Sequence, residues 1–355
     1  MSEKRKGRME QTATTILCGD AREKLKELPR QSVQMCVTSP PYFALRSYGR
    51  GQLEIGIEQT PTEYIHNLVD VFREVKRVLK DDGTLWLNIG DSYWGSGSRG
   101  TDFTKHDTWN GTINKGNRGT ADLSLVPKLV GRFGDIKNKD MIGIPWMLAF
   151  ALREDGWYLR QDIIWAKRNC MPESVTDRYT RSHEYVFLLS KKPKYYYDYK
   201  AIQEPTTTFD DTIRDRETTK LNNTPGRTHM GGLTTNQYEM RNKRDVWQIA
   251  TIPYSGAHFA TFPEALVTPC ILAGSAEGDT VLDPFNGSGT TGVVCVKLGR
   301  NYVGTELNPE YVEMAEKRIA DTRLELEYGI IAGQEKKDTF EYESSLFDEM
   351  SSETA

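Results

Sequence analysis

Short apolar, β-branched runs alternate with longer segments of helical spacing along most of the chain, which predicts an α/β fold. The run at 33–38 stops just before two consecutive prolines, Pro40 and Pro41. Because proline fixes φ and donates no ladder hydrogen bond, this run is expected to be a buried strand that ends in a stiff loop. Further strands are predicted at 14–18, 84–89, 158–165, 184–189, 280–285 and 301–305. Helices are predicted at 63–79, 144–152, 263–272, 293–298 and 311–323.

A glycine-rich turn follows the strand predicted at 280–285. It reads Asn286-Gly287-Ser288-Gly289-Thr290 and leads through a helix and a second strand to the acid Glu306. Glycines let the backbone approach a ligand, and a carboxylate at a strand end accepts hydrogen bonds from ribose hydroxyls. The unit predicts a nucleoside site, although a tight turn and a solvated strand end explain the same residues without a ligand.

The order of the elements indicates a circular permutation. Only about 50 residues follow Glu306, enough for one helix and a polar tail, so strands from the amino-terminal half must complete the sheet. The predicted fold is a circularly permuted seven-stranded α/β sheet, with the loop at Pro40 beside the glycine turn at its carboxyl edge. A dinucleotide fold continues with further strands after its glycine fingerprint, so this order disfavours a nicotinamide-dependent oxidoreductase.

Two polar stretches interrupt the pattern. The stretch 95–140 is rich in glycine and asparagine and lacks periodicity, so we expect a mobile insertion. The stretch 200–250 is rich in arginine, asparagine and glutamine, side chains that read base edges, and is predicted to be a target-recognition region; a disordered loop is the alternative. The rest divides into a flexible terminus at 1–12, two halves of one domain at 13–199 and 251–330, and an acidic, disordered tail at 331–355.

Charge and composition refine this picture. The net charge is −4, but the acidic tail from Glu335 accounts for more than all of it, and basic residues concentrate at 160–200 and 213–244. A basic middle could meet phosphates, or could simply be solvated surface. The five cysteines are scattered without a CxxC pair, which argues against disulfides and against a zinc site. No leader and no apolar run of about 18 residues is found, so a cytoplasmic protein with no membrane contact is expected.

The two loops together resemble a known family. Ser39-Pro40-Pro41-Tyr42 early in the chain and Asp283-Pro284-Phe285-Asn286-Gly287-Ser288-Gly289 late in it are similar to motifs of the bacterial and phage amino-group DNA methyltransferases of the β arrangement. The resemblance covers residues 14–320. It implies a permuted methyltransferase sheet with an inserted target-recognition region, S-adenosylmethionine as cofactor and double-stranded DNA as partner. It also implies a restriction-modification role, with a cognate restriction endonuclease as an optional partner, for a monomer or a homodimer.

The resemblance and the residue types assign the site residues. Ser39, Pro40, Pro41 and Tyr42 form the implied catalytic loop. Asp20 is implied to contact the adenine ring and Glu306 the ribose, although Asp20 with Glu23 also fits a helix capping box. The other implied cofactor residues are Thr38, His258, Phe262, Asp283, Pro284, Phe285, Gly287, Ser288, Gly289, Thr290, Leu307 and Asn308. The predicted DNA contacts are Arg46, Lys167, Arg178, Arg214, Arg227, Arg241 and Arg244.

The chemistry implied for the family fits these residue types and needs no metal. An exocyclic amino nitrogen is a poor nucleophile because its lone pair is delocalised into the base. If the Ser39 hydroxyl and the Pro40 carbonyl accept its two hydrogens, the nitrogen can pyramidalise and attack a sulfonium methyl group. The target base must leave the duplex, so Tyr42, with Phe43 beside it, is predicted to stack on a flipped base.

The identity of the base rests on Ser39. In the family that this chain resembles, serine at this loop position goes more often with cytosine N4, so N4-cytosine is predicted and N6-adenine is the alternative. Methylation at carbon 5 would need a Pro-Cys nucleophile, and Pro269-Cys270 lies in a predicted helix, so Cys270 is expected in the core. A catalytically silent DNA-binding protein and a methyltransferase acting on RNA or protein remain as other classes.

Overall fold

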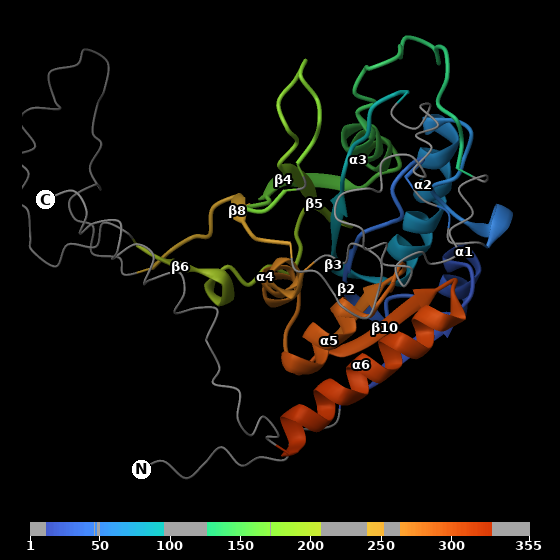
Figure 1. Cartoon of the computed structure of the whole chain (residues 1–355). Helices are drawn as coiled ribbons and strands as arrows, with labels where there is room; N and C mark the ends of the chain where they lie inside the picture. The colour runs from blue at the N-terminus through green and yellow to red at the C-terminus, as the bar shows by residue number, and fades with distance from the viewer. Residues whose placement is uncertain are drawn as a thin grey trace, which may run out of the picture.

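An eight-stranded, mostly parallel sheet forms the centre of the molecule (Figure 1). The computed structural model describes residues 12–45, 47, 50–95, 126–170, 172–206, 240–251 and 263–328. The strands of the sheet follow the order β1 (Thr14–Cys18), β10 (Asn301–Glu306), β9 (Thr280–Asp283), β2 (Val33–Thr38), β3 (Leu79–Ile89), β5 (His183–Ser190), β4 (Tyr158–Ala166) and β8 (Val246–Gln248).

The strand order confirms the permuted sheet. β1 pairs with β10 and β2 pairs with β9, both in parallel, so the two ends of the chain build one half of the sheet together. β5 runs antiparallel between β3 and β4. All seven predicted strands are present, and an eighth, β8, pairs with β4 at the edge. Sequence periodicity missed β8 because it is only three residues long and lies in a polar stretch.

Helices cover both faces of the sheet (Figure 1). Because side chains alternate along a strand, Leu85 and Leu87 of β3 face one helical layer and Trp86 faces the other. The first layer contains α1 (Ala21–Lys24), α2 (Pro61–Val78) and α3 (Ile144–Glu154), and the second contains α4 (Glu264–Gly274), α5 (Thr290–Lys297) and α6 (Pro309–Tyr328). The short elements are η1 (Leu25–Glu27), η2 (Gly51–Leu53), η3 (Lys200–Ile202), β6 (Glu204–Pro205) and β7 (Met240–Arg241).

Several element boundaries differ from those predicted, among them the start of β3 and the end of β9. The chain passes directly from α2 into β3 at Leu79, because Leu79 pairs with Val33 of β2, whereas a loop was expected up to residue 84. β9 ends at Asp283, so Pro284 and Phe285 belong to the following loop. β3 is therefore longer and β9 shorter than predicted, and both are strands of the central sheet.

The described part of the predicted insertion at 95–140 folds onto the domain. Residues 126–140 place Leu129 in the core with 3% of its surface exposed, and the ring of Phe133 stacks on Trp94 at 5.8 Å. The backbone N–H of Trp94 donates to the backbone carbonyl of Asp140 at 2.8 Å. The apolar residues of this segment therefore anchor it, which corrects the expectation of mobility for 126–140.

The ends of the predicted target-recognition region also belong to the folded body. β6 pairs with β7, so residues 206 and 240 lie at the base of a connection whose residues 207–239 are outside the described residues. Trp247 of β8 is 6% exposed and packs in the core. None of the described helices is long and apolar enough to cross a membrane.

Candidate active site

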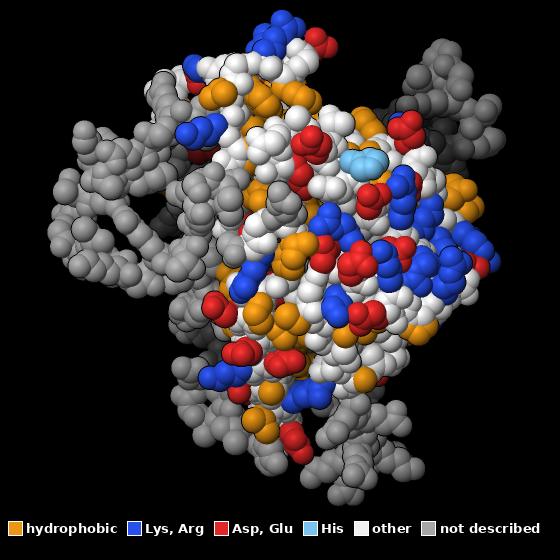
Figure 2. Space-filling view, turned by 90° about the vertical axis from the view of Figure 1, so that its right-hand side faces the viewer, with side chains coloured by type: hydrophobic (Ala, Val, Ile, Leu, Met, Phe, Trp, Pro, Cys, Tyr) orange, Lys and Arg blue, Asp and Glu red, His pale blue; other side chains and the backbone are white. Residues whose placement is uncertain are grey.

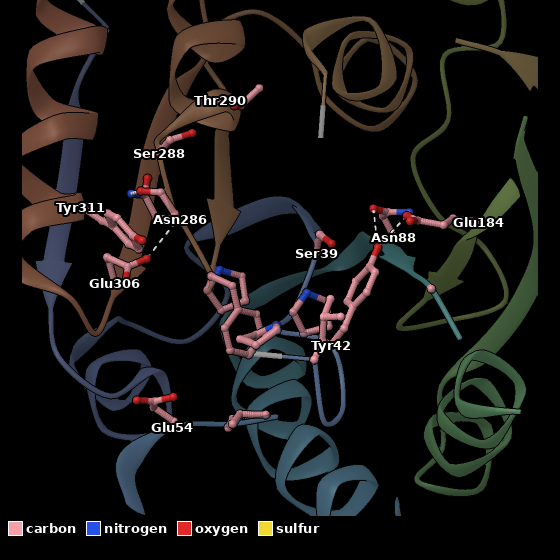
Figure 3. Close-up of a pocket in the computed structure, with 18 of the residues that line it drawn as sticks. Ser39, Tyr42, Glu54, Asn88, Glu184, Asn286, Ser288, Thr290, Glu306 and Tyr311 are labelled. Carbon is pink, nitrogen blue, oxygen red and sulfur yellow. Dashed lines mark hydrogen bonds between the residues drawn. The ribbon is translucent and has the colours of Figure 1, made fainter. Parts of the chain in front are cut away.

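A cavity of about 650 Å³ opens at the carboxyl edge of the parallel strands (Figure 3). Its walls come from the loops after β1, β2, β3, β9 and β10 and from the segment after β4. Parallel sheets bind ligands at this edge, where the strand order reverses. One wall holds the glycine turn and Glu306, and the opposite wall holds Ser39, Tyr42 and Glu184 (Figure 3).

Asp283 joins the two predicted loops behind the wall of the cavity. Its fully buried carboxylate accepts hydrogen bonds from the hydroxyls of Thr38, at 2.6 Å, and Thr291, at 2.7 Å, and from the N–H of Phe285, at 3.0 Å. Thr38 ends β2 and Asp283 ends β9, so these bonds hold the predicted catalytic loop beside the glycine turn. Neither side chain lines the cavity, so the structure places Thr38 and Asp283 behind its wall, and their predicted cofactor contact stays a prediction.

Burial raises the pKa of Asp283 from 3.8 to about 6, although its three hydrogen bonds lower it. The folded protein thus holds this proton more tightly than the unfolded chain does, so the contribution of Asp283 to stability is greatest below pH 3.8. As the pH rises to about 6, we expect that contribution to fall by about 3 kcal/mol and then stay constant.

The variant Asp283→Asn tests this expectation, because an amide has the same shape and does not titrate. The difference in unfolding free energy between the native chain and the variant, measured by urea titration from pH 4 to 8, should shift in favour of the variant between pH 4 and 6. A difference that stays constant over this range would show that the carboxyl titrates normally.

Glu306 closes the glycine turn. Its carboxylate accepts the Gly287 N–H at 2.8 Å and the Asn308 N–H at 2.9 Å, and burial raises its pKa. The Leu307 N–H also bonds to it, and because a carboxylate has about four acceptor positions, at least one remains for a hydroxyl of a ligand in the cavity. Glu306 lines the cavity beside Tyr311 (Figure 3).

The other members of the turn divide into two groups. Gly289 has a φ of +81°, and a Cβ there would meet the Cβ of Ala315 at 2.7 Å, so this glycine permits close packing of α6 on the turn. Gly289 does not line the cavity, and its predicted cofactor contact stays a prediction. The predicted residues that do line it are Pro284, Phe285, Gly287, Ser288, Thr290, Glu306, Leu307 and Asn308.

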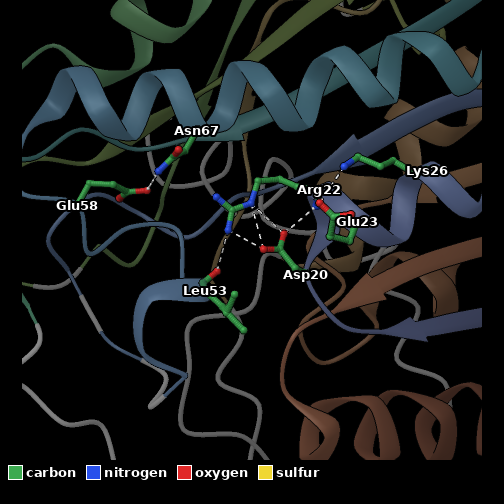
Figure 4. Close-up of polar contacts among 7 residues, drawn as sticks. All are labelled: Asp20, Arg22, Glu23, Lys26, Leu53, Glu58 and Asn67. Carbon is green, nitrogen blue, oxygen red and sulfur yellow. Dashed lines mark hydrogen bonds and ion pairs between the residues drawn. The ribbon is translucent and has the colours of Figure 1, made fainter.

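Asp20 lines the cavity and begins α1. Its carboxylate accepts the Arg22 N–H at 2.8 Å and pairs with the Arg22 guanidinium at 2.5 Å (Figure 4). Glu23 turns away and pairs with Lys26 at 2.8 Å, so the predicted capping box is wrong, although Asp20 is the N-cap. The ion pair with Arg22 fixes the orientation of Asp20 at the cavity.

The whole predicted catalytic loop lines the opposite wall. The Pro41 carbonyl accepts the Tyr64 hydroxyl at 2.7 Å, which anchors the loop to α2. The Tyr42 hydroxyl donates to Glu184 Oε2 at 2.6 Å. Burial, and then the Glu184 carboxylate, raise the pKa of Tyr42, so its phenol stays protonated and donates.

Glu184 is itself held by two other side chains. Asn88 Nδ2 donates to Glu184 Oε2 at 3.2 Å, and the Lys167 ammonium pairs with Glu184 Oε1 (Figure 3 shows Asn88 and Glu184). These contacts hold the Tyr42 hydroxyl in place, and Tyr42 still lines the cavity. Phe43 lies elsewhere: it is 2% exposed and packs on Tyr64 at 5.5 Å, so its predicted stacking on a base is wrong.

Sequence reasoning missed several residues of the walls. Asp91 follows β3 and accepts the N–H groups of Gly143 and Ile144, each at 2.9 Å, so it caps α3 from a distant part of the chain. Arg50 Nη2 donates to Asn308 Oδ1 at 2.6 Å across the cavity rim. The position of Asp91 at a strand end is a usable signal, whereas nothing local marks Arg50.

The predicted DNA-binding residues are dispersed. Lys167 lines the cavity, and Arg178 pairs with Glu173. Arg241 and Arg244 both donate to Glu204 Oε1, at 3.0 and 2.9 Å, and so fasten the base of the β6–β7 connection. Outside the described residues lie Arg46, Arg214, Arg227, His258 and Phe262.

The surface on the side of α1 and α2 shows no large region of one charge. On that face acidic and basic side chains are interspersed, as Figure 2 shows. Basic residues also cluster in other parts of the chain. The loop between β4 and β5 is one such part, because it contains Lys167, Arg168, Arg178 and Arg181.

Comparisons with known proteins agree with this architecture. The chain is 51% identical over 308 residues to the Type II methyltransferase M.SmaI of Serratia marcescens, covering 87% of this chain and 91% of that protein. It is 48% identical over 311 residues to the Type II methyltransferase M.Cfr9I of Citrobacter freundii, covering 88% and 89%.

Solved structures share the fold. The PvuII DNA methyltransferase (cytosine-N4-specific) aligns with a TM-score of 0.55 at 17% identity, covering 89% of this chain and 95% of that one. The protein TTHA0409 of Thermus thermophilus, solved with S-adenosyl-L-methionine, aligns with a TM-score of 0.51 at 24% identity, covering 87% and 94%. The profile of the family described as DNA methylase matches residues 33–317. The chain therefore belongs to this DNA methylase family of amino-group methyltransferases.

Proposed function

We propose that this DNA methyltransferase transfers a methyl group from S-adenosylmethionine to N4 of a flipped-out cytosine at a specific site in double-stranded DNA. The observation that supports this most strongly is one cavity lined by both the Ser39–Tyr42 loop and the glycine turn with Glu306. Ser39 favours cytosine, and N6 of adenine is the alternative target.

The cofactor wall fits a nucleoside with a charged methionine end. Glu306 would accept the ribose hydroxyls, Asp20 would accept from the adenine amino group, and Phe285 offers an aromatic face at the cavity. S-adenosylmethionine, when bound, supplies an electrophilic methyl group. The buried Thr38–Asp283 bond keeps this wall in register with the catalytic loop.

The base wall would prepare the amino group for attack. The Ser39 hydroxyl and the Pro40 carbonyl would accept its two hydrogens, which draws the lone pair out of the ring system. Tyr42, held through its hydroxyl by Glu184, would stack on the base and limit its rotation. These residues act by position and by dipoles already in place.

The product of the reaction tests the proposal. Purified protein is incubated with unmethylated duplex DNA and methyl-labelled S-adenosylmethionine, and the DNA is digested to nucleosides for mass spectrometry. Label in N4-methylcytosine is expected. Label in N6-methyladenine would overturn the base assignment, and label in RNA or protein alone would overturn the substrate.

We propose further that the region 200–250 recognises the target sequence. The described ends of this region pair as β6, β7 and β8 and so belong to the folded body. The residues that would contact the bases of the target sequence are therefore those of 207–239, which contains Arg214 and Arg227. Exchanging 207–239 for the matching segment of a relative of different specificity should change the methylated sequence, read by mapping modified bases in genomic DNA. An unchanged sequence would place recognition elsewhere. A cognate restriction endonuclease would cut the same sequence.

A further inference from the structure

The loop between β4 and β5, residues 167–182, stands at the rim of the cavity. The Lys167 N–H donates to the Ser182 carbonyl at 2.7 Å and closes the loop at its base. From this loop, Lys167, Cys170, Glu173 and Arg181 line the cavity. Figure 1 shows the loop in light green, extending away from the sheet beyond β4 and β5. The rest of the loop therefore lies where DNA would approach the base wall.

Tyr179 in this loop is 96% exposed. A single exposed aromatic residue needs no explanation by itself. The backbone beneath this one, however, is fixed: Arg178 Nη1 donates to the Tyr179 carbonyl at 3.2 Å and pairs with Glu173 at 2.5 Å. The Arg178 guanidinium also lies 4.0 Å from the centre of the Tyr93 ring. The loop thus presents a free ring on an anchored backbone.

The charges around Tyr179 favour a polyanion. Asp177 is paired with Lys139 at 2.7 Å and Glu173 with Arg178, so both acids of the loop are neutralised. Arg168 adds positive charge to the loop, whereas Arg181 is paired with Asp91 at 3.8 Å. The basic residues of this loop would hold the phosphate backbone and bring the ring to the base pairs.

We propose that Tyr179 enters the base stack of the duplex at the position that the target base leaves. A base that flips out leaves a gap between its neighbours, and a planar ring that fills the gap restores stacking on both sides. The inference rests on the proposed function, since it needs a base that is rotated into the cavity. It assigns Tyr179 to stabilising the flipped state, separate from the chemistry at Ser39 and Tyr42.

The test compares Tyr179→Ala with Tyr179→Phe, which keeps the ring. Tyr199→Ala serves as a matched control, because Tyr199 is also exposed, at 46%, and does not line the cavity. Each variant is assayed on a duplex with a paired target base and on one with that base mispaired, using the sequence found by mapping methylated bases. Cofactor affinity is measured alongside.

We expect Tyr179→Ala to lower kcat/KM on the paired duplex about 10- to 100-fold and on the mispaired duplex less than 3-fold, with unchanged cofactor affinity. Tyr179→Phe and Tyr199→Ala should match the native chain. Full activity of Tyr179→Ala on the paired duplex, or an equal loss on both duplexes, would overturn the inference. If the native chain methylates no base in DNA, the proposed function itself fails, which is a distinct result.

Discussion

Replacing Tyr42 with alanine is expected to lower kcat/KM for DNA methylation about 100-fold and to leave the dissociation constant of S-adenosylmethionine within about 3-fold. The ring lies on the base wall of the cavity, 2.6 Å from Glu184 through its hydroxyl, and away from Glu306 and the glycine turn. Its removal deletes the surface on which the flipped base would stack. Steady-state kinetics with duplex DNA and titration calorimetry with the cofactor provide the two measurements.

The variant Tyr42→Phe separates stacking from anchoring. It keeps the ring and loses the hydroxyl, with its bond to Glu184 and its longer contact to Asn88 Oδ1 at 3.5 Å. Glu184 retains Asn88 and Lys167 as partners. We expect a loss of less than about 10-fold, from a ring that is held less firmly. Full activity of Tyr42→Ala would remove the stacking role, and an equal loss in both variants would assign the effect to the hydrogen bond.

The sheet was predictable because its strands are apolar and its motifs sit at strand ends. The permuted order followed from the short chain after Glu306, and the structure confirms that β1 and β10 lie side by side. The strand β8 escaped prediction because three residues in a polar stretch give no periodicity, and its stability comes from pairing with β4 and from burial of Trp247.

The site was predictable in its loops and less so in the roles of single residues. Thr38 and Asp283 are polar residues at strand ends, and such residues commonly face a ligand; the structure shows that they bond to each other behind the wall. Their partnership spans 245 positions in the sequence, so no local pattern reveals it. The role of Glu184 was equally hard to predict from the sequence, because it depends on the Tyr42 hydroxyl, which follows a different strand.

Replacing Glu306 with alanine is expected to weaken S-adenosylmethionine binding about 100-fold, because each charge-assisted hydrogen bond to a ribose hydroxyl contributes about 1.5–3 kcal/mol. Glu306 also holds the N–H groups of Gly287 and Asn308, so part of the loss could come from the turn itself. Glu310→Ala, which removes an exposed carboxylate nearby, is the matched control and should bind cofactor normally.

An analogue of S-adenosylhomocysteine that lacks one ribose hydroxyl separates the two effects. It should bind the native chain about 10-fold more weakly than S-adenosylhomocysteine does, and Glu306→Ala should bind both equally, because the partner of that hydroxyl is already gone. A variant that still discriminates between the two would assign Glu306 only to the turn. The native affinity should also fall as the pH is lowered, starting at a higher pH than for an ordinary glutamate, because burial raises the pKa of Glu306 and protonation removes the charge. This pH dependence should be absent from Glu306→Ala, since that variant lacks the titrating carboxylate proposed to accept the ribose hydroxyls.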